Sequence, residues 1–91
     1  MRGNSKMIKA KAFLEGESIK FVDYVATPME TRFGETTLIE FAGADGEIFR
    51  SLFDTKKALL SQLRERPEAT TVTLKKYITS GEYKRPIWIV E

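Results

Sequence analysis

The chain has 91 residues, of which 42% are hydrophobic and 31% are charged, and its formal net charge is +2. This length holds one small domain with a single hydrophobic core. The chain has no cysteine and no histidine. It therefore has no disulfide and no thiol nucleophile, and it lacks the usual general base and the commonest nitrogen ligand for zinc. These absences predict a protein that is not an enzyme and needs no metal or cofactor.

The charge is spread unevenly along the chain. Residues 1–14 carry +4, residues 15–70 carry −4 and residues 71–91 carry +2. A chain that binds duplex DNA mainly by charge is usually more basic throughout, and a solvated surface of mixed sign is an equally good explanation of this pattern. No apolar run reaches the length of a membrane span, and no apolar stretch typical of a signal peptide follows the first basic residues. We expect a cytoplasmic protein with no membrane partner, and the scarcity of Asn and Gln favours a thermophilic source.

The N-terminal part predicts an arm followed by strands. Residues 1–6 have no apolar period and are typical of a flexible arm, and a single domain is expected over residues 7–91. Residues 7–14 alternate between apolar and basic side chains, which predicts an additional N-terminal strand. Residues 19–25 are rich in β-branched and aromatic residues and predict a strand. Gly16 lies between the two, either in a true turn or in a bend of one long strand.

A loop and a hairpin are predicted next. Residues 26–35 contain Pro28, which cannot occupy a central strand, so they are expected to form a loop. Residues 36–42 and 47–53 read as two strands, because the Asp45-Gly46 pair between them is a strong hairpin signal.

One helix is expected, over residues 54–67. Asp54 or Thr55 can accept hydrogen bonds from the free amides of its first turn, and Pro67 ends it. Its leucines recur at helical spacing and are expected to plug one end of a barrel.

Two further strands, at residues 70–79 and 87–90, follow the helix. Three strands, one helix and two strands is the order of the OB-fold, a five-stranded Greek-key barrel that often binds oligonucleotides. The sequence therefore predicts a mainly β protein with this fold and one α-helix between its third and fourth strands.

Alternation along each strand predicts which side chains face out. In the second strand Glu40 is expected outside. In the third strand Arg50 is expected outside with Leu52, which places Phe49 and Phe53 inside. In the strand at 70–79 the expected outer face carries Lys75 and Tyr77, opposite Val72, Leu74 and Ile78.

A cation beside an exposed aromatic ring is what a single-stranded nucleic acid needs, because bases stack on rings and cations neutralise phosphates. Each candidate has a structural alternative. Tyr77 can pack on Trp88 across the sheet, Phe33 can fold back over the barrel, and Arg50 can pair with Glu40. The candidate nucleic-acid-binding residues are Arg32, Phe33, Arg50, Lys75, Tyr77, Tyr83, Lys84, Arg85 and Trp88.

Two of these groups carry a family resemblance. Arg32-Phe33-Gly34 precedes the second strand, and Gly81 is followed by Tyr83, Lys84 and Arg85. With them, residues 19–91 resemble small single-stranded-DNA-binding OB-fold proteins of archaeal, viral or phage type. The resemblance implies weakly sequence-selective binding in replication or repair, with the ligand across the second and third strands between the loops at 26–35 and 80–85. Phe33 and Tyr83 are then expected to stack bases, while Arg32, Arg50, Lys84 and Arg85 meet phosphates.

Other functions remain open from the sequence. A barrel of this type can be a protein-interaction module, and an exposed strand at 7–14 can add to a partner's sheet or join two copies of the chain. A small chromatin-type protein that binds duplex DNA is a third alternative. The sequence does not separate DNA from RNA as the ligand.

Overall fold

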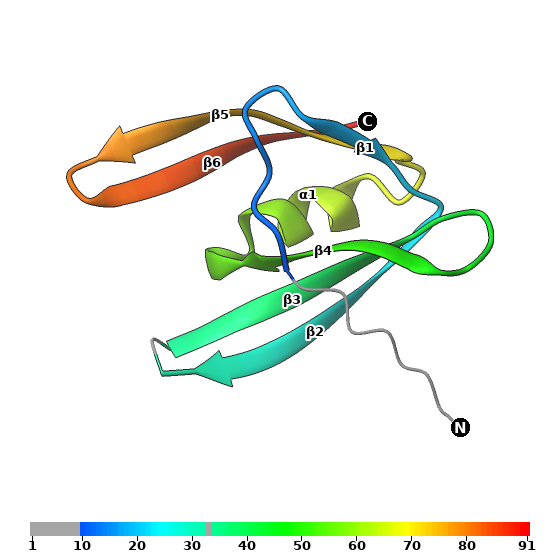
Figure 1. Ribbon diagram of the computed structural model, residues 1–91, viewed down its shortest axis with the longest axis horizontal. Helices are drawn as coiled ribbons and strands as arrows, with labels where there is room; N and C mark the ends of the chain where they lie inside the picture. Colours follow the sequence, from blue (N-terminus) through cyan, green and yellow to red (C-terminus); the bar gives the residue numbers. More distant parts are fainter. Residues whose placement is uncertain (1–9, 33) are drawn as a thin grey trace.

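The computed structural model describes residues 10–32 and 34–91, with the backbone alone at Tyr83. The expectations for the arm at 1–6, for residues 7–9 and for Phe33 lie outside the described residues. The described chain is mainly β, with two three-stranded antiparallel sheets and one short α-helix (Figure 1), as the sequence predicts at this coarse level.

Each sheet contributes one long hairpin and one further strand. The first sheet has the order β2-β3-β4, with β2 at Asp23–Thr31, β3 at Gly34–Ala42 and β4 at Ile48–Asp54. The second sheet has the order β1-β5-β6, with β1 at Ser18–Lys20, β5 at Thr71–Ser80 and β6 at Tyr83–Val90. Figure 1 shows helix α1, Ala58–Glu65, lying between the two sheets.

The strand predicted at 19–25 is broken into β1 and β2, and the break moves the chain from one sheet to the other. The Phe21 amide donates to the Thr70 carbonyl at 2.9 Å, beside the second sheet. The next amide, that of Val22, donates to the Ala42 carbonyl of the first sheet at 2.9 Å. Two consecutive residues thus join the sheets at this corner.

The loop predicted at 26–35 is wrong, because these residues belong to the β2–β3 hairpin. The two strands pair as far as Thr31 opposite Gly34, and the φ of Gly34 is 114°. Pro28 is tolerated within β2 because β2 is an edge strand and needs no ladder hydrogen bond on its outer side. The loop expected at 80–85 is likewise shorter, since β6 begins at Tyr83 and the turn is Gly81-Glu82.

Helix α1 is shorter than the predicted helix at 54–67. The carboxylate of Asp54 accepts hydrogen bonds from the amides of Leu59 and Leu60, the shortest at 2.8 Å, which confirms its expected role at the helix start. Thr55–Lys57 form a 3₁₀ turn, η1, in which two lysines adopt left-handed backbone conformations. The helix leucines are buried in the core, as predicted: Leu59, Leu60 and Leu63.

The predicted facing of β4 is wrong. Arg50 and Leu52 are buried, whereas Phe49 and Phe53 are 42% and 51% exposed. The prediction assumed that a charged side chain must face solvent. Arg50 faces inward because it meets the carboxylate of Glu17, which lies 33 residues earlier in the chain.

The predicted facing of β5 holds only for its first half. Val72 and Leu74 face the core as expected. A register shift between Leu74 and Lys76 then inserts one extra residue into β5. Such a bulge reverses the phase of the strand, so Tyr77 packs against the core and Ile78 is exposed.

Residues 10–17, here called the crossover segment, run between the two sheets at the edges of β4 and β6 (Figure 1). The described part of the strand predicted at 7–14 is not a strand, because residues 10–14 have no regular secondary structure. The Lys11 amide donates to the Ser51 carbonyl of β4 at 3.0 Å, and the Gly16 amide donates to the Leu74 carbonyl of β5 at 2.7 Å. Within the described residues β4 and β6 do not pair, so the sheets do not close into a barrel.

The hydrophobic core lies between the sheets, α1 and the crossover segment. Phe13 enters it from the crossover segment and meets Trp88 edge to face, with the ring centroids 5.0 Å apart. The buried core residues are Phe13, Phe21, Ile39, Phe41, Leu52, Leu59, Leu60, Leu63, Val72, Leu74, Trp88 and Val90.

Candidate nucleic-acid interface

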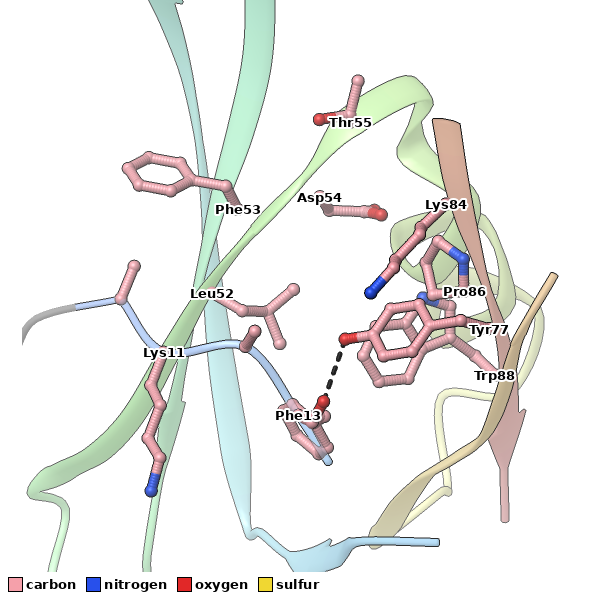
Figure 2. Close-up of a pocket in the computed structure, with 12 residues that line it drawn as sticks. Lys11, Phe13, Leu52, Phe53, Asp54, Thr55, Tyr77, Lys84, Pro86 and Trp88 are labelled. Atoms are coloured by element: carbon pink, nitrogen blue, oxygen red, sulfur yellow. Dashed lines mark hydrogen bonds between the residues drawn. The ribbon is translucent and has the colours of Figure 1, made fainter. Parts of the chain in front are cut away.

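A hollow of about 320 Å³ lies where β4 and β6 fail to pair (Figure 2). Its walls come from the two edge strands and from β5, and the crossover segment closes one side. It is lined by Ala10, Lys11, Ala12, Phe13, Leu52, Phe53, Asp54, Thr55, Tyr77, Lys84, Pro86 and Trp88.

A second, more open hollow adjoins the first. It is lined by Thr31 and Arg32 from the β2–β3 hairpin, by Thr36 of β3, and by Phe53 and Thr55. Because Phe53 and Thr55 line both hollows, the two form one depression, which we call the trough. The trough connects the end of the β2–β3 hairpin with the β5–β6 hairpin.

Phe53 offers the largest exposed aromatic surface in the trough. It lies opposite Leu38 in the sheet register, and Leu38 lies opposite Thr27, so these side chains share the outer face of the first sheet. Val25 and Met29, on the same face of β2, are 52% and 41% exposed. Phe53 therefore stands where an uncovered apolar sheet face meets the trough, and Figure 2 shows its ring pointing away from Tyr77.

Basic side chains come to the trough from three elements. Arg32 is exposed at the end of the β2–β3 hairpin, and Lys11 is exposed on the crossover segment. Lys84 of β6 places its ammonium nitrogen 5.9 Å from the centroid of the Tyr77 ring. The cations thus lie at both ends of the depression, with Phe53 between the two hollows.

Arg50, predicted to meet phosphate from the outer face, is instead part of the core wall. Its guanidinium forms a salt bridge with Glu17 at 2.6 Å and also donates to the carbonyls of Lys11 and Ala12. It lies over the Phe13 ring at 4.1 Å and is 9% exposed. Its partner is Glu17 and not Glu40, which stands opposite Ser51.

The contact between Arg50 and Glu17 is strong enough to change the titration of the acid. The hydrogen bond from Arg50, helped by one from the Leu14 amide, lowers the pKa of Glu17 from 4.5 to about 2. Glu17 is therefore a carboxylate at all ordinary pH values. The pair fastens the crossover segment to β4. The guanidinium, whose Nε has no hydrogen-bond partner, is buried and not accessible to a ligand.

Tyr77 is not on the outer face of β5, where the sequence predicted it, and Trp88 is also turned inward. Trp88 is 8% exposed and belongs to the core. Tyr77 is half-buried, its hydroxyl donates to the Phe13 carbonyl at 2.9 Å, and its amide donates to the Glu15 carboxylate at 2.7 Å. Both rings nevertheless line the first hollow (Figure 2).

The trough therefore brings together Arg32, Tyr77, Lys84 and Trp88 from the predicted set. Lys75, at the β5 bulge, and Arg85 are exposed but line neither hollow. The expected stacking roles of Phe33 and of the Tyr83 side chain lie outside what the structure describes. The sequence does not predict Phe53 as a site residue. The charge of Arg50 predicts that its side chain lies on the outer face, and alternation along β4 then places Phe53 inside.

Comparisons of the chain with protein-family models, curated protein sequences and solved structures found no match. Within residues 10–32 and 34–91, no three His, Cys, Asp or Glu side chains gather as metal ligands do. The same residues include no helix with the length and apolar character needed to cross a membrane.

Proposed function

We propose that this protein binds single-stranded nucleic acid in the trough, by base stacking and phosphate contacts. One observation carries the proposal. Phe53 is 51% exposed at the junction of two hollows whose far ends hold Arg32 and Lys84. Stacking of a base on an aromatic ring contributes about 1–3 kcal/mol, and flanking cations release counterions from the phosphates.

We further propose that the two sheets are the halves of an OB-type barrel. In this view β1 and β2 are one first strand bent at Phe21 and Val22, and the crossover segment occupies the seam between β4 and β6. The antiparallel pairs β1–β5, β2–β3, β3–β4 and β5–β6 support this view. The outer face beside Phe53 then corresponds to the surface on which OB-folds bind oligonucleotides.

Fluorescence anisotropy with a labelled oligo-dT tests the proposal. We expect Phe53→Ala to weaken binding about tenfold, which corresponds to the loss of one stacked base. The control is Ile78→Ala, because Ile78 is an apolar side chain of β5 that is 37% exposed and lines neither hollow. We expect this control to change the affinity less than twofold.

Salt and strand type complete the test. The logarithm of the binding constant is expected to fall with the logarithm of the salt concentration with a slope of about 0.7 per phosphate contacted. Oligo-rU and duplex DNA serve as the competing ligands. Binding that is equally strong for duplex DNA, or that is unaffected by Phe53→Ala, contradicts the proposal.

The second candidate function is protein binding through the first sheet. Val25, Met29 and Phe49 are exposed there, and none of the three touches the first hollow. A protein partner can cover this apolar face without using the trough cations. No oligonucleotide binding at low salt, for the unaltered chain, would favour this function.

A further inference from the structure

The hollow between β4 and β6 has the make-up of a ligand pocket. Its volume of about 320 Å³ is far larger than the roughly 30 Å³ that one water occupies, and it falls in the range of small-molecule sites. Its lining includes four aromatic residues, two lysines and one carboxylate: Phe13, Phe53, Tyr77 and Trp88, Lys11 and Lys84, and Asp54. The Asp54 carboxylate is already held by the amides of Leu59 and Leu60. Flat rings with an adjacent cation suit an aromatic, anionic ligand.

Trp88 supplies an unused hydrogen-bond donor at this pocket. Its indole nitrogen is buried and has no hydrogen-bond partner in the structure, although buried indole N–H groups usually find one. Trp88 itself is 8% exposed and lines the pocket. A ligand atom that accepts a hydrogen bond, such as a base carbonyl or ring nitrogen, can satisfy this donor once a flexible lining side chain moves.

Lys84 is the side chain that can move. It is exposed, and Figure 2 shows it reaching over the hollow toward Tyr77. Its ammonium lies 5.9 Å from the Tyr77 centroid, at the face of the ring, in a contact that is weak at an exposed site. A phosphate group attracts the ammonium more strongly than the uncharged ring does, so a bound phosphate can draw Lys84 away and free the ring face for stacking.

The pocket also offers backbone groups. β4 and β6 are edge strands of their sheets, and edge strands present amide and carbonyl groups on alternate residues. These groups can meet the hydrogen-bonding edge of a base whatever its identity.

We propose that this pocket holds a single nucleotide unit, either free or at the end of a bound strand. The base stacks on Tyr77 and accepts a hydrogen bond from the Trp88 indole, and Lys84 leaves the ring to pair with the phosphate. The choice of a nucleotide as the ligand rests on the proposed function. The trough beyond Phe53 then carries the rest of the strand.

The indole N–H of Trp88 is a specific probe, because the chain has one tryptophan and gives one indole signal in a ¹H–¹⁵N NMR spectrum. We expect thymidine 5′-monophosphate to shift this signal in a saturable way. The control ligand is 2-deoxyribose 5-phosphate, which keeps the sugar and the phosphate but has no base. An unshifted signal at millimolar nucleotide, or an equal shift with the control ligand, overturns the pocket.

A lysine pair tests the role of Lys84. Lys84→Gln is expected to weaken nucleotide binding about two- to fivefold, as fits the loss of one exposed charge contact. Lys75→Gln, an exposed lysine of β5 outside the pocket, is the matched control and leaves binding unchanged. Equal effects of the two variants would contradict a specific phosphate contact at Lys84.

The two proposals can fail separately. Oligo-dT that binds with dependence on Phe53 but leaves the indole signal unmoved overturns the pocket and keeps the proposed function. A nucleotide that shifts the indole signal while no oligonucleotide binds overturns single-strand binding and leaves a nucleotide site.

Discussion

The two long hairpins have a similar build and opposite charge. The β2–β3 hairpin, residues 23–42, has four acidic residues and one basic residue, for a net charge of −3. The β5–β6 hairpin, residues 71–90, has four basic residues and one acidic residue, for a net charge of +3. The net charge of +2 for the whole chain conceals this difference.

This difference in charge gives the two ends of the trough different expected roles in binding. In the proposed complex, most phosphates lie toward the β5–β6 hairpin, and Arg32 meets a phosphate at the other end of the trough. The bases lie toward Phe53 and the apolar face of the first sheet. The acidic hairpin repels phosphates that stray from this path, and Glu30 and Glu35, directly opposite each other in the register, concentrate that charge near its end. Opposed charges across a groove give orientation as well as affinity.

The largest expected effect comes from a substitution that weakens the link between the two sheets. Arg50→Met removes the salt bridge to Glu17 and the bonds to the crossover carbonyls, and it leaves a carboxylate without its partner. We expect a loss of about 3 kcal/mol in the free energy of unfolding, measured by urea denaturation. Lys76→Met, at an exposed position of β5, is the control and is expected to change stability by less than about 0.5 kcal/mol. A loss below about 1 kcal/mol for Arg50→Met would show that the pair does not hold the crossover segment in place.

Acid weakens the same link by a smaller amount. Because the pKa of Glu17 is lowered from 4.5 to about 2, the folded state binds its proton less readily than the unfolded state does. The stabilisation is fully present above pH 4.5 and is lost as the pH falls toward 2. We expect a loss of about 2 kcal/mol, which is less than the full shift implies because the Glu17 side chain is 25% exposed.

Urea denaturation at pH 5.5 and at pH 2.5 measures this loss. Other carboxylates also titrate in this range, so the comparison with Glu17→Gln isolates the contribution of Glu17. The variant is expected to be less stable at pH 5.5 and to lose less stability on acidification. Parallel pH profiles for the two proteins would rule out the linkage.

The smallest expected effects are changes in the affinity for oligo-dT when the charges of the two hairpins are altered. Reversing two charges of the basic hairpin, with Lys84→Glu and Arg85→Glu together, is expected to weaken oligo-dT binding about fivefold or more and to flatten its salt dependence. Neutralising the acidic hairpin, with Glu30→Gln and Glu35→Gln together, is expected to strengthen binding about twofold. Anisotropy titrations at two salt concentrations measure both. Equal and opposite results are not required, but a gain from the first pair or a loss from the second would contradict the assigned roles of the hairpins.

Much of the secondary structure follows from local patterns. The hairpin at Asp45-Gly46, the Asp54 contact at the helix start and the buried helix leucines are each decided by residues close together in the chain. The loop predicted around Pro28 failed because proline excludes a central strand only, and the edge position of β2 depends on the whole sheet.

The candidate site was less predictable, because long-range contacts decide which side chains face the trough. Arg50 faces inward because its guanidinium pairs with Glu17. This orientation of β4 places Phe53 on the exposed face. Tyr77 turns inward only because β5 gains a residue relative to β6. Neither partner is near in sequence, so alternation alone assigns these side chains to the wrong faces.

The bulge in β5 has a consequence for how this protein tolerates insertions and deletions. Beyond the bulge, the side chains of β5 alternate in the opposite phase from those before it. Deletion of Lys75, the extra residue, would remove the bulge and restore regular pairing with β6. Tyr77 would then follow Leu74 at the regular spacing of two and stay on the inner side, where its hydroxyl ties the crossover segment to this hairpin. Loss of one residue at the bulge would thus leave this wall of the pocket in place, whereas loss of one residue from the regular part of β5 would turn the outer half of the strand over.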